Sequence, residues 1–115
     1  PQAATGLGVF TEEDICRAAI VVMFRREPEI VEAHEGNVPG AFIVSYVRPS
    51  DQSLWKYGCE IEGQEVLWSW VNKRGVELPG TNKVTFRIEA GVLRIEEVYP
   101  EGWVSSGEFQ IGDLR

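Results

Sequence analysis

A run of aromatic and apolar residues on either side of one glycine constrains the fold of this chain more than any other feature. Residues 54–71 read LWKYGCEIEGQEVLWSWV, and a two-residue turn at Glu62-Gly63 folds the flanks into a β-hairpin. Cross-strand aromatic pairs stabilise antiparallel sheets, so this hairpin should carry an aromatic inner face. The predicted pairs are Cys59 with Val66, Tyr57 with Trp68, and Trp55 with Trp70.

The segment before the hairpin extends the same face. Residues 41–48 alternate between apolar and other side chains, with Phe42, Val44 and Tyr46 on one side. The loop 49–52 sets Tyr46 opposite Trp55, and the inner face continues into a third strand without a slip in register.

Two further hairpins are predicted within 83–111. Turns at Ala90-Gly91 and around Gly102 fit the geometry of two- and three-residue loops. Agreement of the register from one hairpin to the next is stronger evidence than any single hairpin. We therefore expect an antiparallel meander of about six or seven strands over 29–111, with 29–35 as a strand or, alternatively, a short helix. The predicted pairs are Ile88 with Leu93, Phe86 with Ile95, Val84 with Glu97, Leu93 with Phe109 and Tyr99 with Trp103.

One helix is predicted before the strands, at 12–25, after a loose arm at 1–9. Thr11 is a good N-cap with Asp14 as its capping-box partner, and Pro28 stops the helix. Even the charged side of this helix carries Val21 and Phe24. A helix that is apolar nearly all round is covered nearly all round, so we expect a second subunit or the N-terminal arm to cover these two residues.

The predicted fold class is α+β, with the N-terminal α-helix packed on the concave face of the curved antiparallel β-meander. The length of 115 residues is typical of a single domain, which we expect to span 1–115.

Composition excludes several classes of partner. The chain is acidic, with a net charge of −7, which disfavours nucleic acid and anionic membranes as partners. No apolar run is long enough to span a membrane, and no signal peptide is visible. No metal-ligand spacing or cofactor motif is present, so neither a metal nor a cofactor is expected.

The two cysteines, Cys16 and Cys59, both lie in apolar patterns. We interpret them as small buried apolar residues with free thiols, and a disulfide, which requires them side by side, is the less favoured alternative. Free thiols predict a cytoplasmic protein.

Two groups of residues are candidates for binding. The aromatic residues Tyr46, Trp55, Tyr57, Trp68 and Trp70 either form the core under the helix or line a pocket between helix and sheet. Glu97 falls on the same inner face. A buried carboxylate needs a partner, and either the cation of Arg48 or a group on a ligand would serve.

Several stretches carry a resemblance to known proteins: FTEEDICRAA at the helix, then SYVRPSD, WKYGCEIEG and VLW in the first strands. Together they make the chain similar to small uncharacterised single-domain bacterial proteins of the integron gene-cassette kind. The resemblance covers about half of the chain and rests on structural motifs. It implies a compact cytoplasmic α+β domain that forms an oligomer, and it assigns no function to any residue.

Three functions are predicted, in order of preference. The first is a non-enzymatic accessory or interaction protein that self-associates as a dimer through Val21, Phe24 and an exposed edge strand. The second is a binding protein for a small apolar or aromatic ligand, which would contact the five aromatic residues and Glu97. The third is an enzyme with Glu97 as acid or base, ranked last because no second catalytic group converges on it; no catalytic residue is assigned.

Overall fold

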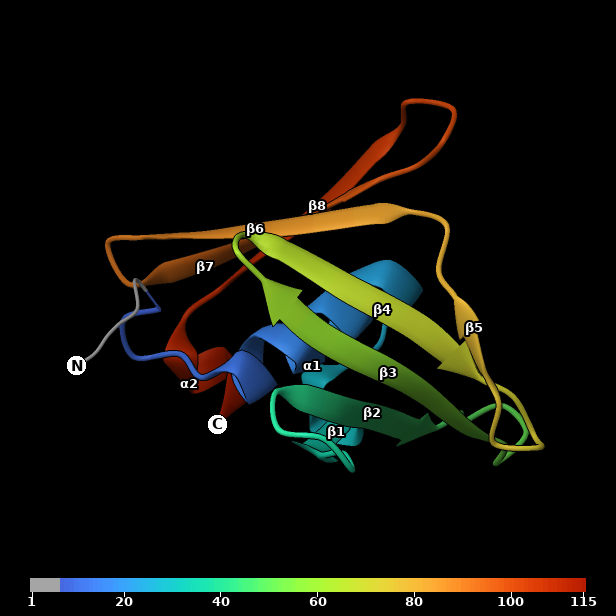
Figure 1. Cartoon of the computed structure of the whole chain (residues 1–115). Coiled ribbons are helices and arrows are strands. Elements are labelled where there is room, and N and C mark those ends of the chain that lie inside the picture. The colour runs from blue at the N-terminus through green and yellow to red at the C-terminus, as the bar shows by residue number, and fades with distance from the viewer. Residues whose placement is uncertain (1–6) are drawn as a thin grey trace.

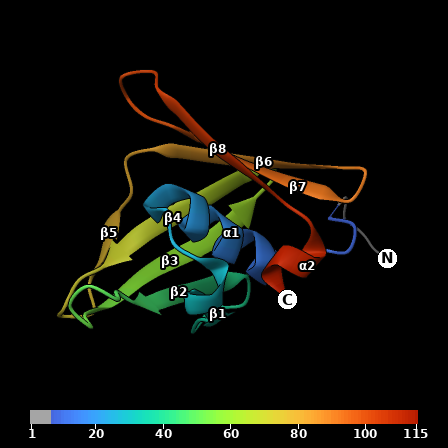
Figure 2. The same ribbon diagram turned by 180° about the vertical axis from the view of Figure 1, so that it is seen from behind.

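In the computed structural model, one helix lies across the concave face of an antiparallel sheet that curls around it (Figure 1 and Figure 2). The structure describes residues 7–115, and residues 1–6 of the predicted arm lie outside this range. The helices are α1 (Glu12–Phe24), the 3-10 turn η1 (Pro28–Ile30) and α2 (Ile111–Leu114). The strands are β1 (Glu32–Glu35), β2 (Ala41–Val47), β3 (Leu54–Glu62), β4 (Glu65–Val71), β5 (Glu77–Pro79), β6 (Lys83–Glu89), β7 (Val92–Val98) and β8 (Val104–Phe109).

The sheet has the order β1-β2-β3-β4-β6-β7-β8, and β5 pairs with β4 beside this path. All pairings are antiparallel, which confirms the α+β meander with the helix on its concave face. The eight strands exceed the predicted number because 72–82, which lies between the predicted hairpins, folds back and adds β5. The segment 29–35 contains both predicted alternatives, a 3-10 turn followed by a strand.

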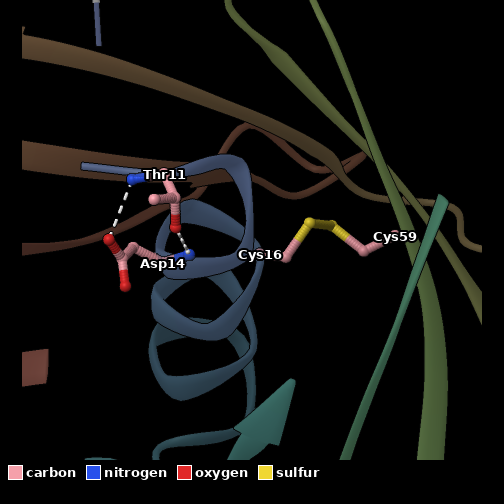
Figure 3. Close-up of a disulfide and its surroundings, with 4 residues drawn as sticks. All are labelled: Thr11, Asp14, Cys16 and Cys59. Carbon is pink, nitrogen blue, oxygen red and sulfur yellow. Dashed lines mark hydrogen bonds between the residues drawn. A yellow bond between two sulfur atoms is a disulfide. The ribbon is translucent and has the colours of Figure 1, made fainter. Parts of the chain in front are cut away.

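The start of α1 follows the predicted capping box. Thr11 Oγ1 accepts a hydrogen bond from the Asp14 backbone N at 3.1 Å, and Asp14 Oδ2 accepts one from the Thr11 backbone N at 2.8 Å (Figure 3). These bonds satisfy N–H groups that the first helical turn leaves unpaired. The helix ends at Phe24, and Arg25 takes the left-handed conformation with φ 54°.

The register of the central hairpin differs from the prediction. Tyr57 lies opposite Trp70, and Cys59 opposite Trp68, because the turn residues are Gly63-Gln64. Gly63 has φ 63° and stands first in the turn, the position where a type II′ turn needs glycine; the predicted turn would have placed Glu62 there. The shift is two residues, so every side chain stays on its predicted face. The registers predicted for β2–β3, β6–β7 and β7–β8 are confirmed.

Cys16 and Cys59 form a disulfide between α1 and β3, with their Cα atoms 6.0 Å apart (Figure 3). The predicted free thiols are therefore wrong, although both residues are buried in the core as expected. Local patterning places each cysteine in an apolar setting. Only the crossing of α1 over the face of β3 brings the two sulfur atoms together.

The side chain of Arg17 connects η1, Val31 and the C-terminal end of the chain to the helix. Its guanidinium donates to the Val31 carbonyl at 2.6 Å and to the carbonyls of Pro28 and Leu114. Arg115 adds an ion pair to Asp14 at 2.6 Å. The C-terminal end is thus held against the first turns of α1, on the same side of the sheet (Figure 2).

Candidate ligand site on the concave face

The aromatic residues under the C-terminal end of α1 form packed core. Phe24 stacks on Tyr57 with ring centroids 4.6 Å apart and meets Trp68 edge-on at 5.9 Å. The hydroxyls of Tyr46 and Tyr57 lie 3.1 Å apart, and Tyr57 is only 1% exposed. Phe24 therefore occupies the space where the pocket between helix and sheet was expected.

This packing also corrects the expected role of Val21 and Phe24. Val21 is buried within the single chain, and Phe24 is half-buried against Tyr57 and Trp68. Tyr57 and Trp68 of the sheet cover Phe24, and Val21 is buried within the chain, so the burial of these side chains does not require a second subunit.

Two of the predicted ligand residues, Trp55 and Trp70, lie toward the edge of the aromatic face. The guanidinium of Arg48 stacks over the Trp55 ring, 4.9 Å from its centroid. The indole N–H of Trp55 donates a hydrogen bond to Ser53 Oγ at 2.7 Å. Trp70 is 44% exposed. These two indoles lie opposite Tyr46 and Tyr57 in the register but are more exposed than that buried pair.

Glu97 is buried on β7, with 3% of its surface exposed. Its Oε2 accepts a hydrogen bond from Asn82 Nδ2 at 2.7 Å, whereas Oε1 has no hydrogen-bond partner among the described residues. Arg48, the cation that sequence reasoning offered to Glu97, pairs with Asp51 instead. A buried carboxylate with an unused oxygen is costly in a folded protein, which makes Glu97 the most informative polar group of the concave face.

Asn82 joins Glu97 to the aromatic core, because its backbone carbonyl accepts a hydrogen bond from Trp68 Nε1 at 3.0 Å. Residues 80–82 can lie close to β4 because position 80 is a glycine. The backbone N of Gly80 donates a hydrogen bond to the Trp68 carbonyl at 3.1 Å. A Cβ on Gly80 would overlap the Trp68 indole ring. The sequence pattern of 72–82 did not identify Asn82 as a site residue. Asn82 meets Glu97 only because this segment folds back along β4.

A hollow of about 400 Å³ opens next to Ser105, the register partner of Glu97, while Glu97 itself does not line it. Ser105 lies directly across from Glu97 on β8, and Tyr99 follows two residues along the same face. Trp103 stands at the rim and is 75% exposed. The lining residues are Arg25, Tyr99, Glu101, Trp103, Val104 and Ser105. The predicted β7–β8 register already placed Tyr99, Trp103 and Ser105 beside Glu97, and could have pointed to this hollow.

The electrostatics of the hollow favour a protonated tyrosine. Interaction with the nearby Glu97 carboxylate, followed by burial, raises the pKa of Tyr99 above its ordinary value. Arg25 opposes this effect to a smaller extent. Tyr99 thus stays a hydroxyl at neutral pH and presents both a donor and an acceptor.

The described residues offer few other chemical groups. Within residues 7–115, no three His, Cys, Asp or Glu side chains gather where they would hold a metal ion. His34 is exposed on β1. In the same range, neither helix has the length and apolar character that crossing a membrane requires.

Comparison with protein-family models found no match, and searches of curated proteins and of solved structures likewise found none at the significance required. The geometry of the concave face is therefore the basis on which a function is assigned.

Proposed function

We propose that this protein binds a small ligand in the hollow next to Ser105, the register partner of Glu97. The observation that supports this most is the buried Glu97 carboxylate, whose Oε1 lacks a partner among the described residues. A ligand that donates a hydrogen bond to this oxygen would remove the cost of leaving it unpaired. The predicted site thereby moves from the space under α1 to the neighbouring end of the same concave face.

The surroundings of Glu97 define the chemistry of the ligand. An ammonium or another N–H donor suits the carboxylate, and Tyr99 and Ser105 offer hydroxyls close to it. Trp103 presents a largely exposed indole at the rim, which suits a flat apolar or aromatic body. The expected ligand is a small molecule with both parts. No catalytic step is assigned to Glu97.

Tryptamine is a suitable first probe because it joins an ammonium to an aromatic ring. Titration into 15N-labelled protein should shift the indole N–H signal of Trp103 and the amide of Ser105. The analogue 3-ethylindole, which lacks the ammonium, should bind more weakly. Glu97→Gln keeps an acceptor for Asn82 but loses the charge, and should weaken tryptamine binding roughly tenfold, as loss of one charge-assisted hydrogen bond predicts.

Matched variants separate binding from folding. Trp103→Ala alters an exposed side chain, so it should leave the melting temperature unchanged and weaken binding roughly two- to tenfold. Glu101→Gln at the rim removes an exposed charge and should have little effect. Equal affinity of the wild type and Glu97→Gln, or shifts far from the β7–β8 hairpin, would contradict the proposal.

A second candidate function, self-association, is favoured by the open edge of β8. In the described part of the chain, β8 pairs only with β7. Val104 on β8 and its partner Val98 on β7 are exposed on the outer side. An unpaired edge next to apolar side chains invites pairing with a second copy. Two β8 strands would then extend the sheets of a dimer.

Sedimentation velocity tests this second candidate. A dimer at micromolar concentration that Ser106→Pro converts to a monomer would support pairing through β8, since proline removes a backbone donor. Phe24→Lys should not change the oligomeric state seen in sedimentation, because Phe24 packs inside the chain. A monomer throughout the accessible concentrations would exclude the dimer and leave the ligand site unaffected.

The resemblance to integron gene-cassette proteins and the cytoplasmic location stay predictions. The Cys16–Cys59 disulfide removes the reason given for the cytoplasm, because disulfides persist mainly in oxidising compartments. Trapping the thiols in intact cells before lysis would decide between the two settings. A protein found with both thiols free would restore the cytoplasmic prediction.

A further inference from the structure

The outer face of the sheet, opposite α1, carries a groove of about 560 Å³. Figure 1 looks onto this face, with β2, β3 and β4 in front of the helix. The size is within the range of ordinary binding sites. We call it the outer groove, and its lining includes Val38, Ile43, Gly58, Glu60, Leu67 and Glu77.

Gly58 makes the floor of the outer groove. A Cβ at this position would lie 2.6 Å from Ser69 Oγ and closer still to Glu77 Oε1. Glu77 reaches this place because β5 folds back onto β4 and sets Glu77 opposite Val71. Ser69 Oγ then donates a hydrogen bond to Glu77 Oε1 at 2.6 Å. The Glu77 carboxylate therefore lies directly over the backbone of Gly58, because Gly58 has no side chain and β5 returns along β4.

The walls combine apolar side chains with negative charge. Val38 is 60% exposed and Leu67 38% exposed, and Ile43 also lines the groove. Glu60 and Glu77 are both exposed. None of the described residues that line the groove is lysine or arginine, so these two carboxylates have no cation within it.

We propose that the outer groove binds an arginine side chain on the surface of a partner protein. A guanidinium pairs with carboxylates through directed hydrogen bonds and sheds its hydration more easily than an ammonium. The three-carbon stem of arginine packs on apolar surface, here Leu67 and Ile43. The groove opens outward through exposed walls, which suits a side chain presented by another surface. The net charge of −7 also attracts a basic partner.

A pair of short peptides tests this directly. Acetyl-Gly-Leu-Arg-Leu-Gly-amide is titrated into 15N-labelled protein, next to the same peptide with citrulline, which has the shape of arginine without its charge. The arginine peptide should shift the amides of Gly58, Leu67 and Ser69, and the citrulline peptide should bind much more weakly. Binding should weaken as salt is added.

Variants assign the effect to the groove. Glu60→Gln and Glu77→Gln should each raise the dissociation constant about two- to fivefold, the range for one exposed ion pair. Glu29→Gln, an exposed carboxylate on η1, serves as the control and should change nothing. Leu67→Lys places a cation in the groove at an exposed strand position, and should abolish binding while the fold is retained.

Three results would overturn the proposal. These are equal binding of the citrulline peptide, no larger effect for Glu60→Gln and Glu77→Gln than for Glu29→Gln, and shifts confined to the hollow next to Ser105. The outer groove lies on the opposite face of the sheet from Glu97, so its failure leaves the ligand proposal untouched.

Discussion

Cys16 on α1 and Cys59 on β3 are covalently joined across the core, so the helix is tied to the sheet it covers. The bridge spans a sequence separation of 43 residues, and in the chain-entropy model closing such a loop stabilises the folded state by about 4 kcal/mol. We predict that Cys16→Ala/Cys59→Ala lowers the free energy of unfolding by about 2–4 kcal/mol. Urea denaturation of both proteins measures the loss.

Reduction of the wild type gives the matched control. With reductant present, the wild-type midpoint should fall toward that of the double variant, and the double variant should not respond to reductant. Wild-type protein in which both thiols react with a thiol reagent before unfolding would contradict the disulfide.

Burial raises the pKa of the Tyr57 hydroxyl well above its ordinary value of 10.0, and the hydrogen bond with Tyr46 adds to the shift. The unfolded chain releases this proton near pH 10 but the folded chain does not. Stability contributed by Tyr57 is therefore present below about pH 10 and is lost as pH rises further. The urea midpoint of the wild type should fall as the pH rises above about 10.

Tyr57→Phe removes this titration and should flatten the pH dependence. The urea midpoint of the variant should still fall slightly with rising pH because of Tyr99, whose pKa is also raised. At neutral pH the variant should lose about 1 kcal/mol, because the Tyr46 hydroxyl loses its partner. Identical slopes in the two proteins would contradict this account.

Gly107 on β8 allows α1 to approach the sheet. A Cβ at this position would lie 2.8 Å from Val22 Cγ2, so Gly107→Ala should overpack the interface and cost about 1–3 kcal/mol. In the Val22→Ala background the same substitution should cost much less, and a double-mutant cycle measures the difference. Gly112→Ala, where an added Cβ meets nothing within 4 Å, should be neutral or slightly stabilising.

Arg17 donates to three backbone carbonyls, those of Pro28 and Val31 after the helix and that of Leu114 near the C-terminal end. Arg17→Met keeps the apolar stem but removes the guanidinium donor from these carbonyls, and should cost about 2–4 kcal/mol. The Pro28 carbonyl keeps a second donor, the Val31 backbone N. The backbone amides of α2 should also exchange their hydrogens faster, because Arg17 holds this helix through the Leu114 carbonyl. Arg17→Lys should restore only part of the loss, since an ammonium cannot match the planar guanidinium. Arg87→Met, at an exposed ion pair, should change stability by less than about 0.5 kcal/mol.

Local rules were enough to predict most of the fold. The capping box at Thr11 and Asp14 depends on residues three apart, and the β6–β7 and β7–β8 hairpins depend on short loops. The error at Gly63 was also local: the glycine fits the first turn position as well as the second by sequence, and backbone φ decides between them. Because faces alternate with a period of two, the error left the inner face intact.

The candidate site was only half visible from the sequence. Alternation placed Glu97 on the inner face, and the β7–β8 register placed Tyr99 and Ser105 beside it. The partner of Glu97 could not be found in this way. Arg48 was the nearest cation by pattern, but it bonds to Asp51 within its own loop, and Asn82 arrives from a segment without periodicity.

The sequence by itself determined which side chains share a face, where the helix begins and which segments form hairpins, because these depend on period and turn chemistry within a few residues. Only the tertiary structure decided that Cys16 meets Cys59, that Phe24 covers Tyr57, and that Asn82 reaches Glu97. Each of these contacts depends on the angle and depth at which the helix or the returning strand crosses the sheet. That placement is set by packing of the whole core, which no local pattern encodes.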